Sequence, residues 1–106
     1  MVNPWRGEVA VTLDGVRHRA RLTLGALAEL EDALGAASLV ELVERFESGR
    51  FSSRDVLMLI VAGLRGGGWT GTAEDLLKVE IGGGPVEAAR LAAELLARAF
   101  TVPEGG

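Results

Sequence analysis

An uninterrupted apolar segment between Asp55 and Arg65 predicts a helix at the centre of the fold. The residues between these two charges carry no charged or hydrogen-bonding side chain, so other segments must cover the element on every side. Ser52 or Ser53 can cap its amino end. Asp55 and Arg65 match the positive and negative ends of a helix dipole. The β-branched residues within the segment favour a strand, but its length and flanks favour a helix.

An alternation of apolar and polar residues predicts a β-hairpin over residues 8–22. Asp14-Gly15 between two alternating runs is a strong signal for a two-residue type I′ turn. Such a turn fixes the register, and the expected inner, apolar face pairs Leu13 with Val16, Val11 with His18 and Val9 with Ala20, extended by Leu22. The expected outer face pairs Thr12 with Arg17, Ala10 with Arg19 and Glu8 with Arg21. An isolated hairpin is marginal in water, so helices should cover the inner face.

Capping signals and periodicity predict helices near residues 24–34, 39–48, 54–65, 73–80 and 85–100. Thr23, Ser38 and Thr72 suit N-caps, Gly35 suits a left-handed C-terminal position, and Pro85 suits a first helical residue. The expected fold class is therefore α+β: an N-terminal β-hairpin packed on about five helices, mostly helical. We expect a single domain over residues 1–106, with an arm (1–7), the hairpin (8–22), a helical part (23–100) and a tail (101–106).

The composition excludes several classes of function. The chain has 106 residues and no cysteine, which rules out disulfides, thiolate zinc sites and thiol catalysis. Its net charge of −4 argues against a nucleic-acid binder that relies on phosphate neutralisation. We expect no signal peptide and no membrane span, because the first residues are polar and no apolar run approaches the roughly 20 residues that a span needs.

The residues offer little support for catalysis or for a cofactor. His18 is the only histidine and has no companion for a metal site, so a packed or rim position is the better interpretation. The two Gly-Gly-Gly runs lack the lysine and hydroxyl residue of a phosphate loop, and we interpret them as flexible loops or hinges. The carboxylates of the first two helices fall on expected exteriors: Glu29, Glu31, Asp32, Glu41, Glu44 and Glu47. We therefore expect no enzyme, no cofactor and no metal.

Three features are candidates for binding a partner protein. The final helix carries a charged stripe (Glu87, Arg90, Glu94 and Arg98), which leaves a broad apolar arc from which Ala89, Ala92 and Leu96 could contact another helix. Arg17, Arg19 and Arg21 share the outer face of one strand and could bind an acidic surface, although a solvated face explains them slightly better. Trp69, like Trp5, lies in an expected loop, either covering the core or anchoring a partner.

Several segments also carry a family resemblance, through their order and spacing: Arg6-Gly7-Glu8-Val9, Leu22–Glu31, Arg45-Phe46, Gly49-Arg50, Arg54-Asp55-Val56 and Ala62–Gly68. Over roughly residues 5–100, the chain resembles a family of gene-transfer-agent and phage tail proteins. Its members are described as tail assembly chaperones or, in places, as tail-tube proteins. The resemblance implies a non-enzymatic role in building the tail of a phage-like particle.

Two roles follow from the resemblance, and the chaperone is the first expectation. A tail assembly chaperone would bind the tape-measure protein or the tube subunit in the bacterial cytoplasm. The alternatives are a structural tail-tube component, associated with the particle, and a general helical protein-binding module. Tube-forming folds build rings from extended sheets, whereas this sequence predicts one hairpin, and this contrast favours the chaperone. A homo-oligomer is a further expectation, and neither nucleic acid nor membrane is expected as a partner.

Overall fold

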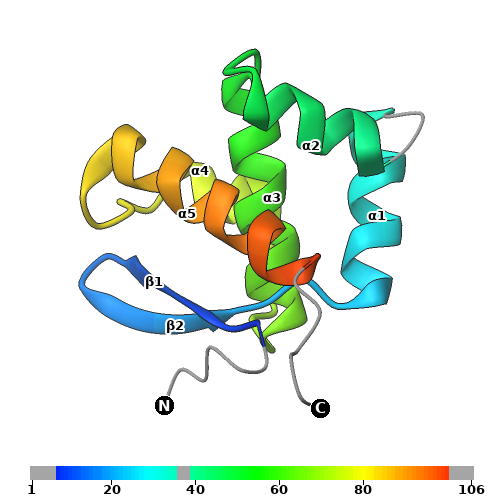
Figure 1. Ribbon diagram of the computed structural model, residues 1–106. Helices are drawn as coiled ribbons and strands as arrows, with labels where there is room; N and C mark the ends of the chain where they lie inside the picture. Colours follow the sequence, from blue (N-terminus) through cyan, green and yellow to red (C-terminus); the bar gives the residue numbers. More distant parts are fainter. Residues whose placement is uncertain (1–6, 36–38, 101–106) are drawn as a thin grey trace, which may run out of the picture.

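The protein is an α+β structure in which one β-hairpin packs on five helices (Figure 1). The computed structural model describes residues 7–35 and 39–100. The hairpin consists of β1 (Val9–Leu13) and β2 (Val16–Ala20). The helices are α1 (Leu24–Leu34), α2 (Leu39–Glu47), α3 (Ser53–Gly66), α4 (Ala73–Leu77) and α5 (Gly84–Ala99). The expected fold class is confirmed.

The hairpin has the register that its turn predicts. Each expected pair of strand residues is present, from Val9 with Ala20 to Leu13 with Val16. Asp14 and Gly15 adopt φ angles of 48° and 80°, the positive values that a type I′ turn requires. Two assignments to the faces were wrong. Val16 is 59% exposed because it lies beside the turn, beyond the core residues of the inner face, and Glu8 is buried where the chain enters β1.

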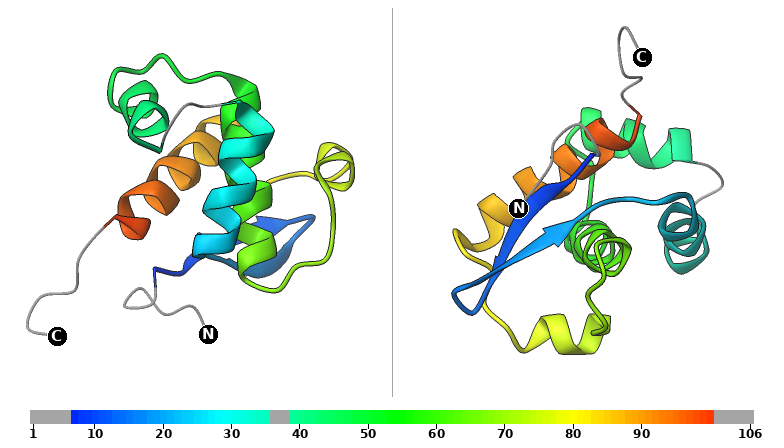
Figure 2. Two further views of the ribbon diagram at one scale, coloured as in Figure 1. Left: turned by 90° about the vertical axis from the view of Figure 1, so that its right-hand side faces the viewer. Right: turned by 90° about the horizontal axis from the view of Figure 1, so that it is seen from below.

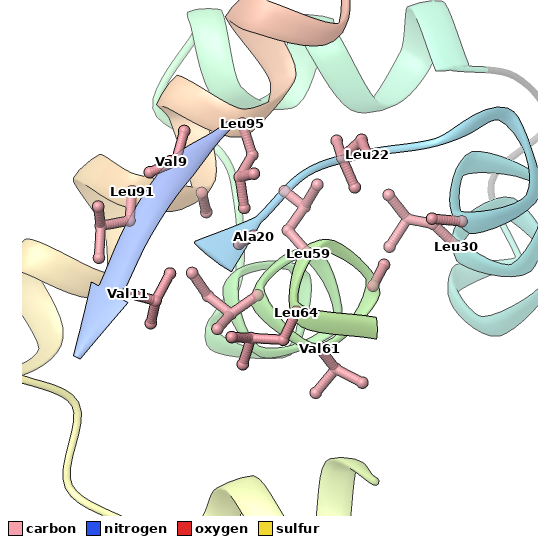
Figure 3. Close-up of a cluster of buried hydrophobic side chains, with 14 of the residues drawn as sticks. Val9, Val11, Ala20, Leu22, Leu30, Leu59, Val61, Leu64, Leu91 and Leu95 are labelled. Carbon is pink, nitrogen blue, oxygen red and sulfur yellow. The ribbon is translucent and has the colours of Figure 1, made fainter. Parts of the chain in front are cut away.

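The apolar segment forms α3, which lies at the centre of the molecule, as predicted. Figure 2 shows α1 on one side of α3 and α5 with the hairpin on the other. Leu59, Ile60 and Leu64 are fully buried, and the close-up in Figure 3 shows Leu59 and Leu64 among side chains from the hairpin, α1 and α5. This packing on several sides explains why the segment carries no polar side chain.

Glycines at the end of α3 allow β2 to approach its backbone directly. A Cβ atom on Gly66 or Gly67 would overlap the carbonyl oxygens of Arg21 and Arg19, respectively. The Arg21 N–H also donates to the Gly63 carbonyl at 2.7 Å. The interpretation of this glycine run as a flexible loop was therefore wrong for its first two residues, which are small because two backbones meet there.

The predicted caps are largely confirmed. Thr23, Ser52 and Thr72 cap α1, α3 and α4, and Gly35 ends α1 with a φ of 63°. The proposed cap Ser38 lies outside the described residues. The helix predicted over 73–80 ends earlier, at Leu77, because residues 80–82 pair with the edge of β1. The Asp14 N–H donates to the Glu80 carbonyl, and the Gly82 N–H donates to the Thr12 carbonyl, both at 2.9 Å. Helix α5 begins at Gly84, which makes Pro85 its second residue.

The predicted charged stripe of α5 forms a chain of ion pairs. Arg90 contacts Glu87 at 2.6 Å and Glu94 at 2.8 Å, and Arg98 contacts Glu94 at 2.8 Å. The hydrogen bonds from Arg98 are the main cause that lowers the pKa of Glu94 below its ordinary value of 4.5, and Arg90 adds to this effect. Ion pairs of this partly exposed kind are worth less than about 1 kcal/mol each.

We expect this stripe to make the stability sensitive to acid. Because the pKa of Glu94 is lower in the folded state, its stabilisation is complete above pH 4.5 and is lost as the pH falls through the folded-state pKa. Glu94→Gln should lower the melting temperature near neutral pH and flatten its decline below about pH 4.5. The measurement is thermal unfolding as a function of pH, with Glu29→Gln on the exposed face of α1 as the control. An identical acid decline in wild type and Glu94→Gln would contradict the expectation.

Candidate functional site

An open pocket of about 550 Å³ lies between β2 and the loop that follows α3. We call it the basic pocket, and its lining residues are Arg17, His18, Arg19, Gly67, Gly68, Trp69 and Thr70. Three of the residues expected to bind a partner (Arg17, Arg19 and Trp69) thus come together in one site. Arg21, the fourth expected residue of this group, is half-buried and does not line the pocket.

The end of α3 determines the shape of this pocket. The Gly67 N–H donates to the Gly63 carbonyl at 3.0 Å and the Trp69 N–H to the Leu64 carbonyl at 2.9 Å, which turns the chain back at the helix end. The Trp69 ring lies so close to Gly71 that a Cβ atom there would overlap it. Trp69 is half-buried and also packs against the core. It therefore covers part of the core and, at the same time, presents its remaining surface to the pocket.

The arginines of the pocket are not neutralised by the rest of the fold. Within residues 7–35 and 39–100, Arg17 and Arg19 form no ion pair. The arginines that do form ion pairs lie on α2 and α5. Both side chains are exposed. A guanidinium binds carboxylates through two parallel hydrogen bonds, so this pocket suits a carboxylate-bearing protein surface.

Among the described residues, the backbone groups of Arg17 at the strand edge in this pocket have no hydrogen-bond partner. The Thr12 carbonyl bonds to Gly82, on the side of β1 away from β2, so Thr12 and Arg17 form a non-hydrogen-bonded pair of the hairpin. The N–H and C=O of Arg17 therefore point away from β1, as does the Arg21 N–H that bonds to Gly63. At Arg19 the carbonyl faces Gly67. The end of α3 thus covers the β2 edge at Arg19 and Arg21 and leaves it open at Arg17.

His18 also lines this pocket. It is half-buried, and the pocket lining contains no carboxylate and no cysteine. In the part of the chain that the structure describes, no group of three potential ligand residues could hold a metal ion. The same part contains no helix that is both long and apolar enough to cross a membrane.

A second recess, which we call the apolar groove, separates α2 from α5. Its volume is about 390 Å³, and its lining residues are Val43, Phe46, Glu47, Ala93, Leu96, Ala97 and Phe100. Leu96, one of the expected partner-binding residues, forms part of its wall although it is only 4% exposed. Ala89 is half-buried and lies outside the groove lining.

Ala92 was wrongly placed on the exposed arc of the final helix. It is fully buried, because α5 packs against α3 and β1 along this face. The apolar arc that remains at the surface is centred on the groove, at Ala93 and Phe100. Trp5, the other tryptophan considered as a cover for the core or as an anchor for a partner, lies outside the described residues.

The hairpin and the five helices define a small, mostly helical α+β protein, and the basic pocket and the apolar groove are open to another molecule. The chain matches the family model described as phage tail tube protein, GTA-gp10, over residues 6–102, and it belongs to that family. The resemblance to gene-transfer-agent and phage tail proteins is thus confirmed, and the chain is a component of a phage-like tail. No curated protein and no solved structure matches it.

Proposed function

We propose that this protein contributes to the tail of a gene-transfer-agent or phage-like particle as a tail-tube protein, through protein–protein contacts and without catalysing a reaction. Membership of the tail-tube family over residues 6–102 is the observation that carries the proposal. The open basic pocket, with two arginines that are not paired within the described residues, supports a binding role. The expected preference for a chaperone over a tube component does not fit the description of the family, which names the tube protein.

A tail assembly chaperone is the second candidate, and one observation favours it. The sheet of the described residues consists of two strands, with a single bridge from Leu13 to Ile81 at its edge. A tube wall made from continuous sheet needs longer strands with free edges, and the end of α3 covers part of the β2 edge here. A chaperone would hold the tape-measure protein or the tube subunit before assembly, in the cytoplasm.

The abundance of the protein in finished particles distinguishes the two candidates. We expect quantitative mass spectrometry of purified particles to find it in many copies per tail, comparable with the most abundant tail protein. A chaperone would instead be scarce in particles and enriched in the lysate, in complexes with a tail protein. A protein that is absent from particles and also binds no tail protein in the lysate would overturn both candidates.

A further inference from the structure

The helix farthest from the basic pocket carries carboxylates that the fold does not neutralise. Glu44 and Glu47 are exposed on α2, three residues apart, so their side chains share one face of the helix. Neither forms an ion pair within the described parts of the chain. Val40, one turn before Glu44, is 64% exposed on the same face. We call these three residues the acidic face of α2.

Helix α3 holds the acidic face and the basic pocket at opposite ends of the molecule. Its first turn is joined to α2, because Arg45 Nη2 lies 3.1 Å from Asp55 Oδ1. Its last turn is joined to β2, because Arg21 N–H bonds to Gly63 at 2.7 Å. The junction residues Asp55 and Gly63 are eight positions apart on this 14-residue helix, which separates the two junctions by about 12 Å along the helix axis. Both views with a vertical α3 place α2 at one end of this helix and the hairpin at the other (Figures 1 and 2).

We propose that the basic pocket of one copy binds the acidic face of α2 of a second copy, head to tail. This inference rests on the proposed role as a tube component, which requires many copies to associate. The charges match in number and spacing: Arg17 and Arg19 are about 7 Å apart along β2. Glu44 and Glu47 are about 5–6 Å apart on their helix face, within the reach of two arginine side chains.

The charge of the whole chain makes this contact selective. With a net charge of −4, two copies repel each other in most orientations. The basic pocket is a positive surface that remains free in the fold, so it directs the acidic face of another copy towards β2. Exposed ion pairs are individually weak, and Trp69 in the pocket with Val40 on α2 adds an apolar contact.

A contact of this kind repeats without limit. The two surfaces are different and lie at opposite ends of one chain, so each bound copy presents a free pocket or a free acidic face to the next. Such a heterologous contact gives a ring if the rotation between copies closes, and a filament if it does not. Either product would suit a tubular assembly.

Two complementary double variants test the contact. Arg17→Glu with Arg19→Glu makes the pocket acidic, and Glu44→Arg with Glu47→Arg makes the face of α2 basic. All four side chains are exposed, so both variants should fold, which circular dichroism and thermal unfolding verify. Sedimentation at low salt should show each variant associating with itself at least about tenfold more weakly than wild type. A mixture of the two variants should recover the wild-type association, because every contact then joins opposite charges again.

The controls separate this contact from a general effect of charge. Arg65→Glu with Lys78→Glu changes the net charge by the same amount as the Arg17→Glu, Arg19→Glu double variant, at exposed positions outside the pocket, and should leave association unchanged. A monomeric wild type, unaffected double variants, or a mixture that fails to recover would overturn the proposal.

The incorporation of each variant into particles, measured separately, tests the proposed function. If the protein is abundant in particles and both variants still associate normally, the proposed function is supported and the proposed contact is wrong. If the protein is absent from particles but both variants lose a salt-dependent self-association, the proposed contact is supported and the proposed function is wrong.

Discussion

Leu59→Asp should remove most or all of the stability of this protein. Leu59 is fully buried in the middle of α3, where side chains from the hairpin and the neighbouring helices surround it (Figure 3). An isolated carboxylate in such an environment loses its hydration without gaining a partner, and the cost is several kcal/mol. Small domains have a free energy of unfolding of only about 5–15 kcal/mol, so the variant should be largely unfolded or melt at a much lower temperature.

The measurement is chemical and thermal unfolding of Leu59→Asp beside Leu24→Asp. Leu24 is 83% exposed in the first turn of α1, so the same substitution there places a carboxylate in water at the positive end of a helix. The control should stay within about 0.5 kcal/mol of wild type. A Leu59→Asp protein that unfolds cooperatively near the wild-type melting temperature would contradict the central placement of α3.

Asp55→Ala should destabilise the protein strongly, although less than Leu59→Asp. The Asp55 carboxylate accepts a hydrogen bond from the Ser52 N–H at 2.9 Å, while the Asp55 N–H donates to Ser52 Oγ at 3.1 Å. It also pairs with Arg45 at 3.1 Å and is 5% exposed. Removing it leaves the Arg45 guanidinium, whose side chain is 28% exposed, with only Glu41 at 3.6 Å, so the loss should lie below the roughly 3–5 kcal/mol that breaking a fully buried pair costs.

Helix α4 supplies a matched control for Asp55. It begins with the same reciprocal cap, in which Asp75 accepts from the Thr72 N–H at 2.9 Å, but Asp75 is exposed and has no arginine partner among the described residues. Asp75→Ala should therefore destabilise the protein far less than Asp55→Ala in urea unfolding. Asp55→Asn keeps the shape but loses the charge, and should fall between them. Equal effects at Asp55 and Asp75 would show that the cap alone matters and the ion pair does not.

The Asp55–Arg45 pair also matters for the proposed head-to-tail contact. This pair joins α2 to the start of α3, and α3 in turn ends against β2. The relative position of the acidic face and the basic pocket therefore depends on the junction at Asp55. Loss of stability and loss of self-association are nevertheless separable, because the arginines and glutamates of the contact are exposed and do not take part in that junction.

The sequence by itself determined the elements of this fold, because local interactions decide them. Asp14-Gly15 set the hairpin register through the positive φ angles of its turn, and Thr23 with Gly35 set the limits of α1. The apolar segment of α3 required a central position. Each of these signals acts between residues close in the chain, or through a hydrophobic pattern whose period is that of the element itself.

Only the tertiary structure decided the candidate site, because its residues come from segments about 50 positions apart in the sequence. The sequence named Arg17, Arg19 and Trp69 separately, and nothing local indicated that the end of α3 would bring them together. That approach depends on Gly66 and Gly67, whose missing side chains let two backbones touch. A periodic pattern predicts the direction of a side chain but not its neighbours. The exposure of Ala92, Val16 and Glu8 therefore depended on which other segments pack against them.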